Sequence, residues 1–261
     1  MKKNRLLAQK FNESIGEYVP TYHHMYGVSL FGSNVDRLLN LIESRWGKQV
    51  EWIATVNPEF IMNALKDAHF LNILQKRTTV NVIDGVGLIW AQRVKSGNSW
   101  FKTGVEILKG QHRESLITGA DLMEKLCEVA EEKGRTVFFY GGWEDRSART
   151  AGYFMKKYPN LKVVGYQAED FDLSTQADYL FVARAMKKQE EWIDANLEKL
   201  KVNLVMGVGR SFDYYSGDLE RAPNWVRKMG MEWLYSLYKE PKRWRRQLEL
   251  PKFMFMVLFG K

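Results

Sequence analysis

Short apolar runs alternate with amphipathic stretches from about Val28 onward, and this alternation constrains the fold more than any other feature of the chain. By pattern we expect strands at residues 50–54, 79–83, 136–140, 162–164, 177–186 and 204–208. Between them, apolar residues recur at helical spacing, most clearly over residues 120–132 and 146–157. Strands that alternate with helices predict an α/β domain with a mostly parallel sheet flanked by helices.

Local signals mark where several of these elements begin and end. Asn57-Pro58 predicts a helix start, with Asn as the N-cap and Pro at the first helical position. Gly134 is expected to end a helix, and Gly141-Gly142 predicts a tight turn. Residues 177–186 fit a helix or a strand, and we predict a strand. Residues 96–115 are polar at their start, and we predict an exposed excursion there.

The last forty-one residues carry nearly all of the excess charge. They hold ten Lys or Arg against three Glu, which is seven of the chain's eight net positive charges. Trp and Phe residues are interleaved with these charges, a composition typical of a peripheral membrane-contact segment. The side chains that we expect at an anionic membrane surface are Lys242, Arg245, Lys252, Phe253 and Phe255.

Composition limits the compartment and the kind of site. The single cysteine, Cys127, excludes an intramolecular disulfide and a cysteine-based zinc site, and we expect it to be buried and inert. The basic N-terminus lacks the apolar core of a secretory signal. The apolar run at residues 253–259 is too short to cross a bilayer. We therefore expect a cytoplasmic protein that associates peripherally with the inner face of the membrane.

Polar residues and turn glycines gather where predicted strands end, which is where open α/β sheets bind ligands. They are Thr55, Asn57, Asp84, Gly141, Gly142 and Asp213. Each alone also has a purely structural interpretation, because Asn can cap a helix and Asp before Gly can turn a chain.

Several other patterns carry little weight. The glycines at Gly85-Val86-Gly87 and Gly207-Val208-Gly209 begin a dinucleotide fingerprint whose third glycine is missing, which disfavours an oxidoreductase. Asp170 and Asp172 resemble a metal-binding acid pair but fit a solvated loop better, and His23-His24 lacks a partner at metal-ligand spacing. We expect no metal site.

Nine short motifs follow one another at characteristic distances. They are Thr55-Val56-Asn57-Pro58-Glu59, Ile83-Asp84-Gly85-Val86-Gly87, Thr118-Gly119-Ala120-Asp121-Leu122, Tyr140-Gly141-Gly142, Lys188-Gln189-Glu190-Glu191-Trp192-Ile193, Ser211-Phe212-Asp213, Arg221-Ala222-Pro223, Glu232-Trp233-Leu234-Tyr235 and Glu240-Pro241-Lys242-Arg243-Trp244-Arg245-Arg246. From about Val28 to Lys261 this series resembles the bacterial WecG/TagA/CpsF glycosyltransferase family. Members add a sugar from a UDP-sugar to a polyprenyl-diphosphate-linked acceptor in cell-surface polymer synthesis.

The resemblance implies a Rossmann-like domain over residues 28–220, after an N-terminal arm over residues 1–27. Residues 221–261 would form a helical appendage that docks on the membrane and helps to close the site. The family needs no metal or cofactor. Catalysis falls to Asp84 as general base together with Thr55, and the substrate-binding positions are Asn57, Gly141, Gly142, Gln189, Asp213, Arg221, Arg243 and Arg246.

These assignments fit the chemistry of sugar transfer. A carboxylate can deprotonate the acceptor hydroxyl as it attacks the anomeric carbon, and a single base opposite the leaving group inverts that centre. Without a metal, arginines and backbone N–H groups must stabilise the departing diphosphate. The expected partners are a UDP-sugar, a polyprenyl-diphosphate-linked saccharide and an anionic inner leaflet, with homo-oligomerisation left open and no nucleic acid expected.

The chain departs from the family pattern at three places. Ala185-Met186-Lys187 replaces a Gly-x-Pro segment, Arg210 stands where a glycine is expected, and Ser236 stands where an arginine is expected. A degenerate member is therefore one alternative, and a basic protein that binds nucleic acid or another anionic surface is a second. The donor sugar also stays open among N-acetylmannosamine, its uronic acid, glucose and glucuronic acid.

Overall fold

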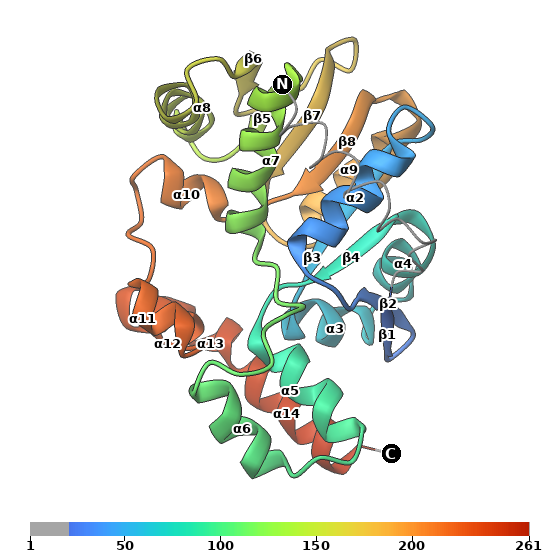
Figure 1. Ribbon diagram of the computed structural model, residues 1–261, viewed down its shortest axis with the longest axis vertical. Helices are drawn as coiled ribbons and strands as arrows, with labels where there is room; N and C mark the ends of the chain where they lie inside the picture. Colours follow the sequence, from blue (N-terminus) through green and yellow to red (C-terminus); the bar gives the residue numbers. More distant parts are fainter. Residues whose placement is uncertain (1–20, 261) are drawn as a thin grey trace, which may run out of the picture.

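The computed structural model describes residues 21–260, apart from the side chains of Arg243, Arg246 and Gln247. Its centre is an eight-stranded sheet in the order β1-β2-β4-β3-β8-β7-β5-β6 (Figure 1). Within the described chain, β1 and β2 pair antiparallel and every other neighbouring pair is parallel. The strands are β1 (Tyr22–Met25), β2 (Val28–Phe31), β3 (Glu51–Val56), β4 (Val80–Ile83), β5 (Thr136–Gly141), β6 (Lys162–Gln167), β7 (Gln176–Ala183) and β8 (Lys201–Gly207). This confirms the predicted α/β, Rossmann-like fold.

Helices cover both faces of the sheet, and each face has its own apolar core. Residues on β3 show the division, because Trp52 and Ala54 join one core while Ile53 joins the other. One face carries α2 (Val35–Arg45), α7 (Gly119–Lys133), α8 (Arg146–Lys157) and α10 (Ser211–Tyr215). The opposite face carries α3 (Pro58–Ala64), α4 (Ala68–Asn72), α5 (Val86–Lys95), α9 (Lys188–Asn196) and α14 (Glu249–Phe259).

The local signals in the sequence correspond to real element ends. The Asn57 side chain accepts a hydrogen bond from the Phe60 N–H at 3.2 Å and caps α3, and Gly134 ends α7 in the left-handed conformation. The ambiguous stretch 177–186 lies mostly in β7, so the predicted strand is confirmed. Cys127 is fully buried, as predicted.

Two segments are more ordered than we predicted. Residues 96–115, predicted to form an exposed excursion, are largely exposed but contain the helix α6 (Trp100–Leu108). Thr103 and Ile107 on α6 are buried because this helix packs against α5. Residues 22–25, which we had assigned to an N-terminal arm, form the edge strand β1, and residues 1–20 lie outside the described part.

The C-terminal segment crosses from one side of the sheet to the other. After α10 the chain forms α11 (Asn224–Lys228), α12 (Glu232–Lys239) and α13 (Trp244–Gln247) at the carboxyl ends of the strands (Figure 1). It then ends in α14, which packs against α3 and α5. Phe253 on α14 is fully buried and meets the ring of Tyr26 edge-on at 6.4 Å. The segment is therefore anchored in the core of the domain at its last helix.

A candidate active site at the switch point of the sheet

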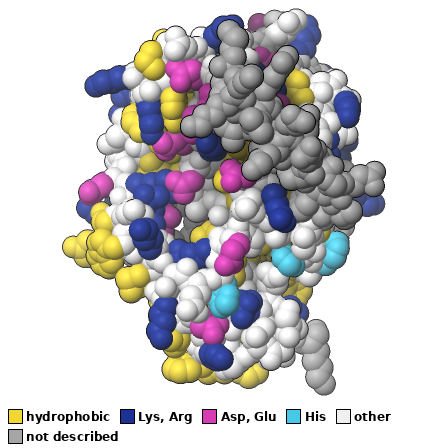
Figure 2. Space-filling model, viewed as in Figure 1, with side chains coloured by type: hydrophobic (Ala, Val, Ile, Leu, Met, Phe, Trp, Pro, Cys, Tyr) yellow, Lys and Arg dark blue, Asp and Glu magenta, His cyan; other side chains and the backbone are white. Residues whose placement is uncertain are grey.

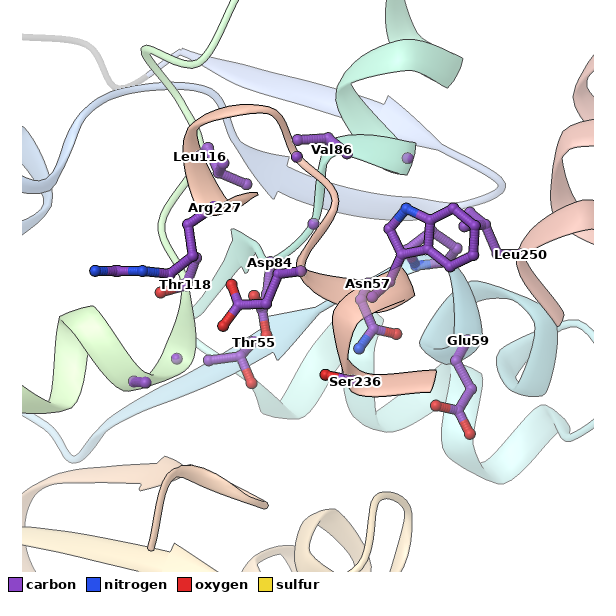
Figure 3. Close-up of a pocket in the computed structure, with 18 of the residues that line it drawn as sticks. Thr55, Asn57, Glu59, Asp84, Val86, Leu116, Thr118, Arg227, Ser236 and Leu250 are labelled. Carbon is purple, nitrogen blue, oxygen red and sulfur yellow. The ribbon is translucent and has the colours of Figure 1, made fainter. Parts of the chain in front are cut away.

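A cavity of about 750 Å³ lies at the carboxyl ends of β3, β4 and β8. In the strand order, β3 and β8 are neighbours although they come from opposite ends of the domain, so the crevice beside them is a topological switch point. The Thr55 hydroxyl at the end of β3 donates to the Gly207 carbonyl at the end of β8, at 3.4 Å. Residues of α6, α11, α12 and α14 also line the cavity. Figure 3 shows Arg227, Ser236 and Leu250 among them.

Asp84 is the acid that stands closest to the end of β4, and its side chain points into the cavity (Figure 3). The backbone N–H of Asp84 donates to the Val56 carbonyl at 2.7 Å, and this hydrogen bond holds the loop in place. Burial raises the pKa of Asp84 to about 7, and the Glu232 carboxylate adds to this effect. The Arg221 guanidinium and a hydrogen bond from the Gly119 backbone N–H oppose it. The result is a carboxyl group that changes protonation near neutral pH.

Thr55 and Asn57 lie beside Asp84, as we predicted for strand-end residues (Figure 3). Thr55 is buried, and Gly119 approaches it so closely that a Cβ on Gly119 would stand 3.2 Å from the Thr55 methyl. Asn57 caps α3 and also lines the cavity, so its role as a helix cap does not exclude a role in binding. Thr55, Asn57 and Asp84 therefore line one cavity, and their roles in catalysis and binding stay predictions.

Arg221 also lines the cavity, but carboxylates already occupy its guanidinium. It donates to Asp121 at 2.6 Å and to Glu232 at 3.3 Å. Arg227 reaches the same Asp121 at 3.5 Å. In this arrangement Arg221 ties the start of α7 to α12, and so holds the wall of the cavity in place.

Two arginines in the cavity escaped the sequence analysis, and among the described contacts neither pairs with a carboxylate. Arg113 donates to the backbone carbonyls of Arg227 at 2.7 Å and Ile107 at 3.3 Å, and burial lowers its pKa. Arg184 follows β7, donates to the Tyr140 hydroxyl and lies 4.9 Å from the centre of that ring. Two cations without a carboxylate partner, facing a cavity, suit an anionic ligand.

Gln189 lines the cavity, yet both ends of its amide are occupied by the protein. Its Oε1 accepts from the Gly209 N–H at 2.9 Å, and its Nε2 donates to Glu190 at 2.6 Å. Burial raises the pKa of Glu190 to about 7, although it also accepts from the Lys187 N–H at 2.7 Å. Through its hydrogen bond with Gly209, Gln189 thus holds the loop after β8 in place.

Gly141, Gly142 and Asp213 lie beside the cavity and do not line it. Gly141 has a φ of +94°, and a Cβ there would stand 2.4 Å from the Ala183 carbonyl, so the turn requires glycine. Asp213 pairs with Arg146 at 2.7 Å and with Arg210 at 3.2 Å. These residues shape the strand ends, and substrate contact at them stays a prediction.

Known proteins resemble this chain over most of its length. Residues 23–261 match the model of the glycosyl transferase WecG/TagA/CpsF family. The chain belongs to this family. It is similar to an N-acetylglucosaminyldiphosphoundecaprenol N-acetyl-beta-D-mannosaminyltransferase of Bacillus subtilis (strain 168), with 29% identity over 90% of each chain. Proteins of the same description in Bacillus spizizenii, 29% identical over 79% of this chain and 78% of the relative, and in Staphylococcus aureus (strain MRSA252), 27% identical over 80% of each, are also similar.

The departures from the WecG/TagA/CpsF pattern all lie at or next to the cavity. Lys187 adopts a left-handed φ of +73° and pairs with Asp67 at 2.5 Å. Arg210 bridges Asp213 to Glu240 at the end of α12, the latter at 2.5 Å. Ser236 lies on the cavity wall (Figure 3). Arg210 therefore connects the loop after β8 to the C-terminal segment.

The predicted membrane-contact set needs one correction. The prediction that Phe253 contacts the membrane is wrong, because its ring is fully buried in the core and cannot reach a lipid surface. Phe255 is 65% exposed, and Lys242, Arg245 and Lys252 also face solvent. The side chains of Arg243 and Arg246, predicted to reach the diphosphate, lie outside the described residues. Within residues 21–260 no helix is both long and apolar enough to cross a membrane.

Proposed function

We propose that this chain transfers a hexose-type sugar from a UDP-sugar to a polyprenyl-diphosphate-linked saccharide, with Asp84 as general base. The observation that carries the proposal is Asp84 itself: a carboxyl group with a pKa of about 7, inside a cavity at the switch point of the sheet. A general base works best when its pKa lies near the operating pH. Family membership supports the reaction class.

In this mechanism the Asp84 carboxylate takes the proton of the acceptor hydroxyl as its oxygen bonds to the anomeric carbon. The bond from that carbon to the UDP oxygen breaks on the opposite face, so the configuration inverts. UDP leaves with the electron pair, and the proton ends on Asp84. Thr55 is placed to orient the reacting hydroxyl, because it lines the cavity beside Asp84.

Negative charge develops on the UDP diphosphate, and cations of the cavity would stabilise it. Arg113 and Arg184 suit this role, because neither has a carboxylate partner among the described contacts. A guanidinium stays charged and pairs with phosphate oxygens through its planar fork. The proposed reaction uses no metal or other cofactor. These arginines would instead neutralise the charge on the diphosphate, as a divalent cation does in other enzymes.

The names of the relatives support the choice of substrates. They describe transfer of N-acetylmannosamine to an N-acetylglucosamine carried on diphosphoundecaprenol. We propose the same class of lipid-linked acceptor here, in the synthesis of a cell-surface polymer, with N-acetylmannosamine first among the candidate donor sugars. Such an acceptor resides in a membrane, and the basic C-terminal segment would hold the protein peripherally on the inner leaflet.

The test is UDP release from a panel of UDP-sugars, with a soluble polyprenyl-diphosphate–N-acetylglucosamine analogue as acceptor. Acceptor-dependent turnover with one donor, lost in Asp84→Asn, is the expected result. UDP binding without turnover for any donor would contradict the proposed activity and favour a degenerate member. A protein that binds no UDP would refute the choice of donor, and product with a retained anomeric configuration would refute the single-base mechanism.

A further inference from the structure

Helix α6 presents an apolar face to solvent at the end of the molecule that holds α5 and α14 (Figure 1). Trp100 is 55% exposed and Phe101 is 65% exposed, with their rings edge-on at 5.8 Å. Leu108, at the other end of the helix, is 49% exposed. On another side of α6, Thr103 and Ile107 are buried against the domain. Clustered exposed aromatic residues of this kind mark an interaction surface.

Helix α14 presents a second aromatic pair at the same end of the molecule. Phe255 is 65% exposed and Phe259 is 68% exposed, with their ring centres 4.8 Å apart. Because α6 and α14 both pack against α5, the two pairs belong to one end of the domain. Figure 2 shows hydrophobic side chains gathered along this edge, over α6 and α14 in Figure 1.

The charge around α6 favours an anionic partner. Apart from Arg113, which faces the cavity, residues 93–114 contain four Lys or Arg and two acids, Glu106 and Glu114. The Lys102 side chain is 78% exposed and its Nζ lies 3.9 Å from Glu106, while Lys109 also faces solvent. Lys252 on α14 is also exposed, although it pairs with Glu249 at 2.9 Å. Aromatic residues flanked by lysines suit the headgroup region of an anionic bilayer, whereas two copies of this basic face would repel each other.

The same two helices border the cavity. Gly104, Ile107 and Leu108 of α6 line it, as do Leu250 and Met254 of α14. A Cβ on Gly104 would meet no atom within 4 Å, so this turn of α6 borders open space. A surface that seats α6 and α14 together would therefore bring the cavity next to the lipid headgroups.

We propose that α6 is a second membrane-contacting element, which inserts Trp100 and Phe101 into an anionic bilayer beside Phe255 and Phe259 of α14. This deepens the proposed function, on which it rests only in taking the substrate to be lipid-linked. The C-terminal segment is then one of two contacts, and the other comes from the middle of the chain.

Vesicle co-sedimentation of the full chain tests the proposal, with vesicles of phosphatidylcholine and phosphatidylglycerol and, in parallel, of phosphatidylcholine alone. Trp100→Ser/Phe101→Ser should weaken binding to the anionic vesicles by about tenfold or more, since two large apolar side chains no longer enter the interface. Phe255→Ser/Phe259→Ser should have a similar effect, and the quadruple variant should fall below both.

The matched control is Trp143→Ser/Tyr166→Ser, which removes two exposed aromatic residues, 75% and 51% exposed, from the opposite end of the sheet. It should bind vesicles like the unaltered chain. Equal binding by the Trp100/Phe101 variant would overturn the proposal, as would a homodimer that this variant dissociates in light scattering. Turnover of a water-soluble acceptor should survive the α6 changes while turnover of a vesicle-embedded acceptor falls. Vesicle binding needs no transfer, so its result stands even if the proposed reaction is wrong.

Discussion

At the residue scale, the properties that make Asp84 a useful base also make it unfavourable for folding. Its pKa is about 7 in the folded protein, against an ordinary value of 3.8. Between these values the folded form keeps a proton that the unfolded form has lost, so stability falls as pH rises from about 4 to 7. Each unit of pKa shift corresponds to about 1.4 kcal/mol. Asp84 is thus a site where activity and stability oppose each other.

Asp84→Asn should therefore lower transfer by roughly 10²–10⁴-fold while making the protein more stable at pH 8. The gain in melting temperature should shrink toward pH 4, because the unaltered carboxyl is then protonated in both states. Calorimetry at several pH values measures this. A constant difference across pH would show that Asp84 does not titrate near neutrality, and unchanged transfer would show that it is not the base.

The rate should also report the pKa of Asp84 directly. We expect kcat/KM to rise with pH and to level off above about pH 7, because only the ionised carboxylate can accept the proton. A profile that stays flat from pH 5 to 8 would contradict the assignment, since the base would then be ionised throughout this range.

Arg113→Met should weaken UDP binding by about tenfold, because a charge-assisted hydrogen bond to phosphate contributes about 1.5–3 kcal/mol. Among the described contacts Arg113 bonds the backbone carbonyls of Arg227 and Ile107, so the free protein should also lose about 1–3 kcal/mol of stability. Calorimetric titration with UDP measures the change. Arg149→Met, which removes a surface arginine paired with Asp218, is the matched control and should bind UDP normally.

The sequence could predict only part of this site, for a physical reason. The sequence indicated Thr55, Asn57 and Asp84 because each lies at or just after the end of a strand, and parallel strands end at one edge of the sheet. Arg113 could not be found this way, since α6 and the loop after it carry it to the cavity. Arg184 follows β7 in the structure, but the strand predicted over residues 177–186 extends past it, so the sequence did not place it at a strand end.

At the element scale, α14 has two roles that its sequence pattern does not separate. Its aromatic residues alternate between the core and solvent, with Phe253 fully buried and Phe255 65% exposed. The composition of the segment predicted surface contact for both. Deleting the last helix would therefore remove part of the core along with any membrane contact, so point substitutions test the segment more cleanly.

Phe253→Ala should lower the free energy of unfolding by about 3–5 kcal/mol, because it leaves a cavity in the core beside Tyr26. Phe255→Ala, two residues further along the same helix, should change it by less than about 0.5 kcal/mol. Urea denaturation followed by circular dichroism distinguishes them. Similar values for the two variants would mean that α14 is not packed as described.

At the scale of the whole molecule, alternation in the sequence predicted the sheet and the helices on both of its faces. It did not predict β1, β2 or α6. Four-residue strands such as β1 carry little pattern, and α6 is stabilised by packing against α5 through Thr103 and Ile107. The uneven charge was evident from composition alone, and it concentrates attraction for an anionic surface at one end of the chain.

That asymmetry leads to a prediction for Lys242→Gln/Arg245→Gln, which removes two exposed cations from the C-terminal segment. Each basic residue near an anionic leaflet contributes about 1 kcal/mol, so binding to anionic vesicles should fall roughly thirtyfold at low salt. The difference should shrink as salt is added, because screening weakens the attraction that the variant lacks. Lys156→Gln/Lys201→Gln removes the same charge from exposed positions on α8 and β8, and should bind vesicles nearly as well as the unaltered chain. Equal losses in the two variants would mean that net charge alone governs vesicle binding. The C-terminal segment would then contribute no more than any other exposed basic residues.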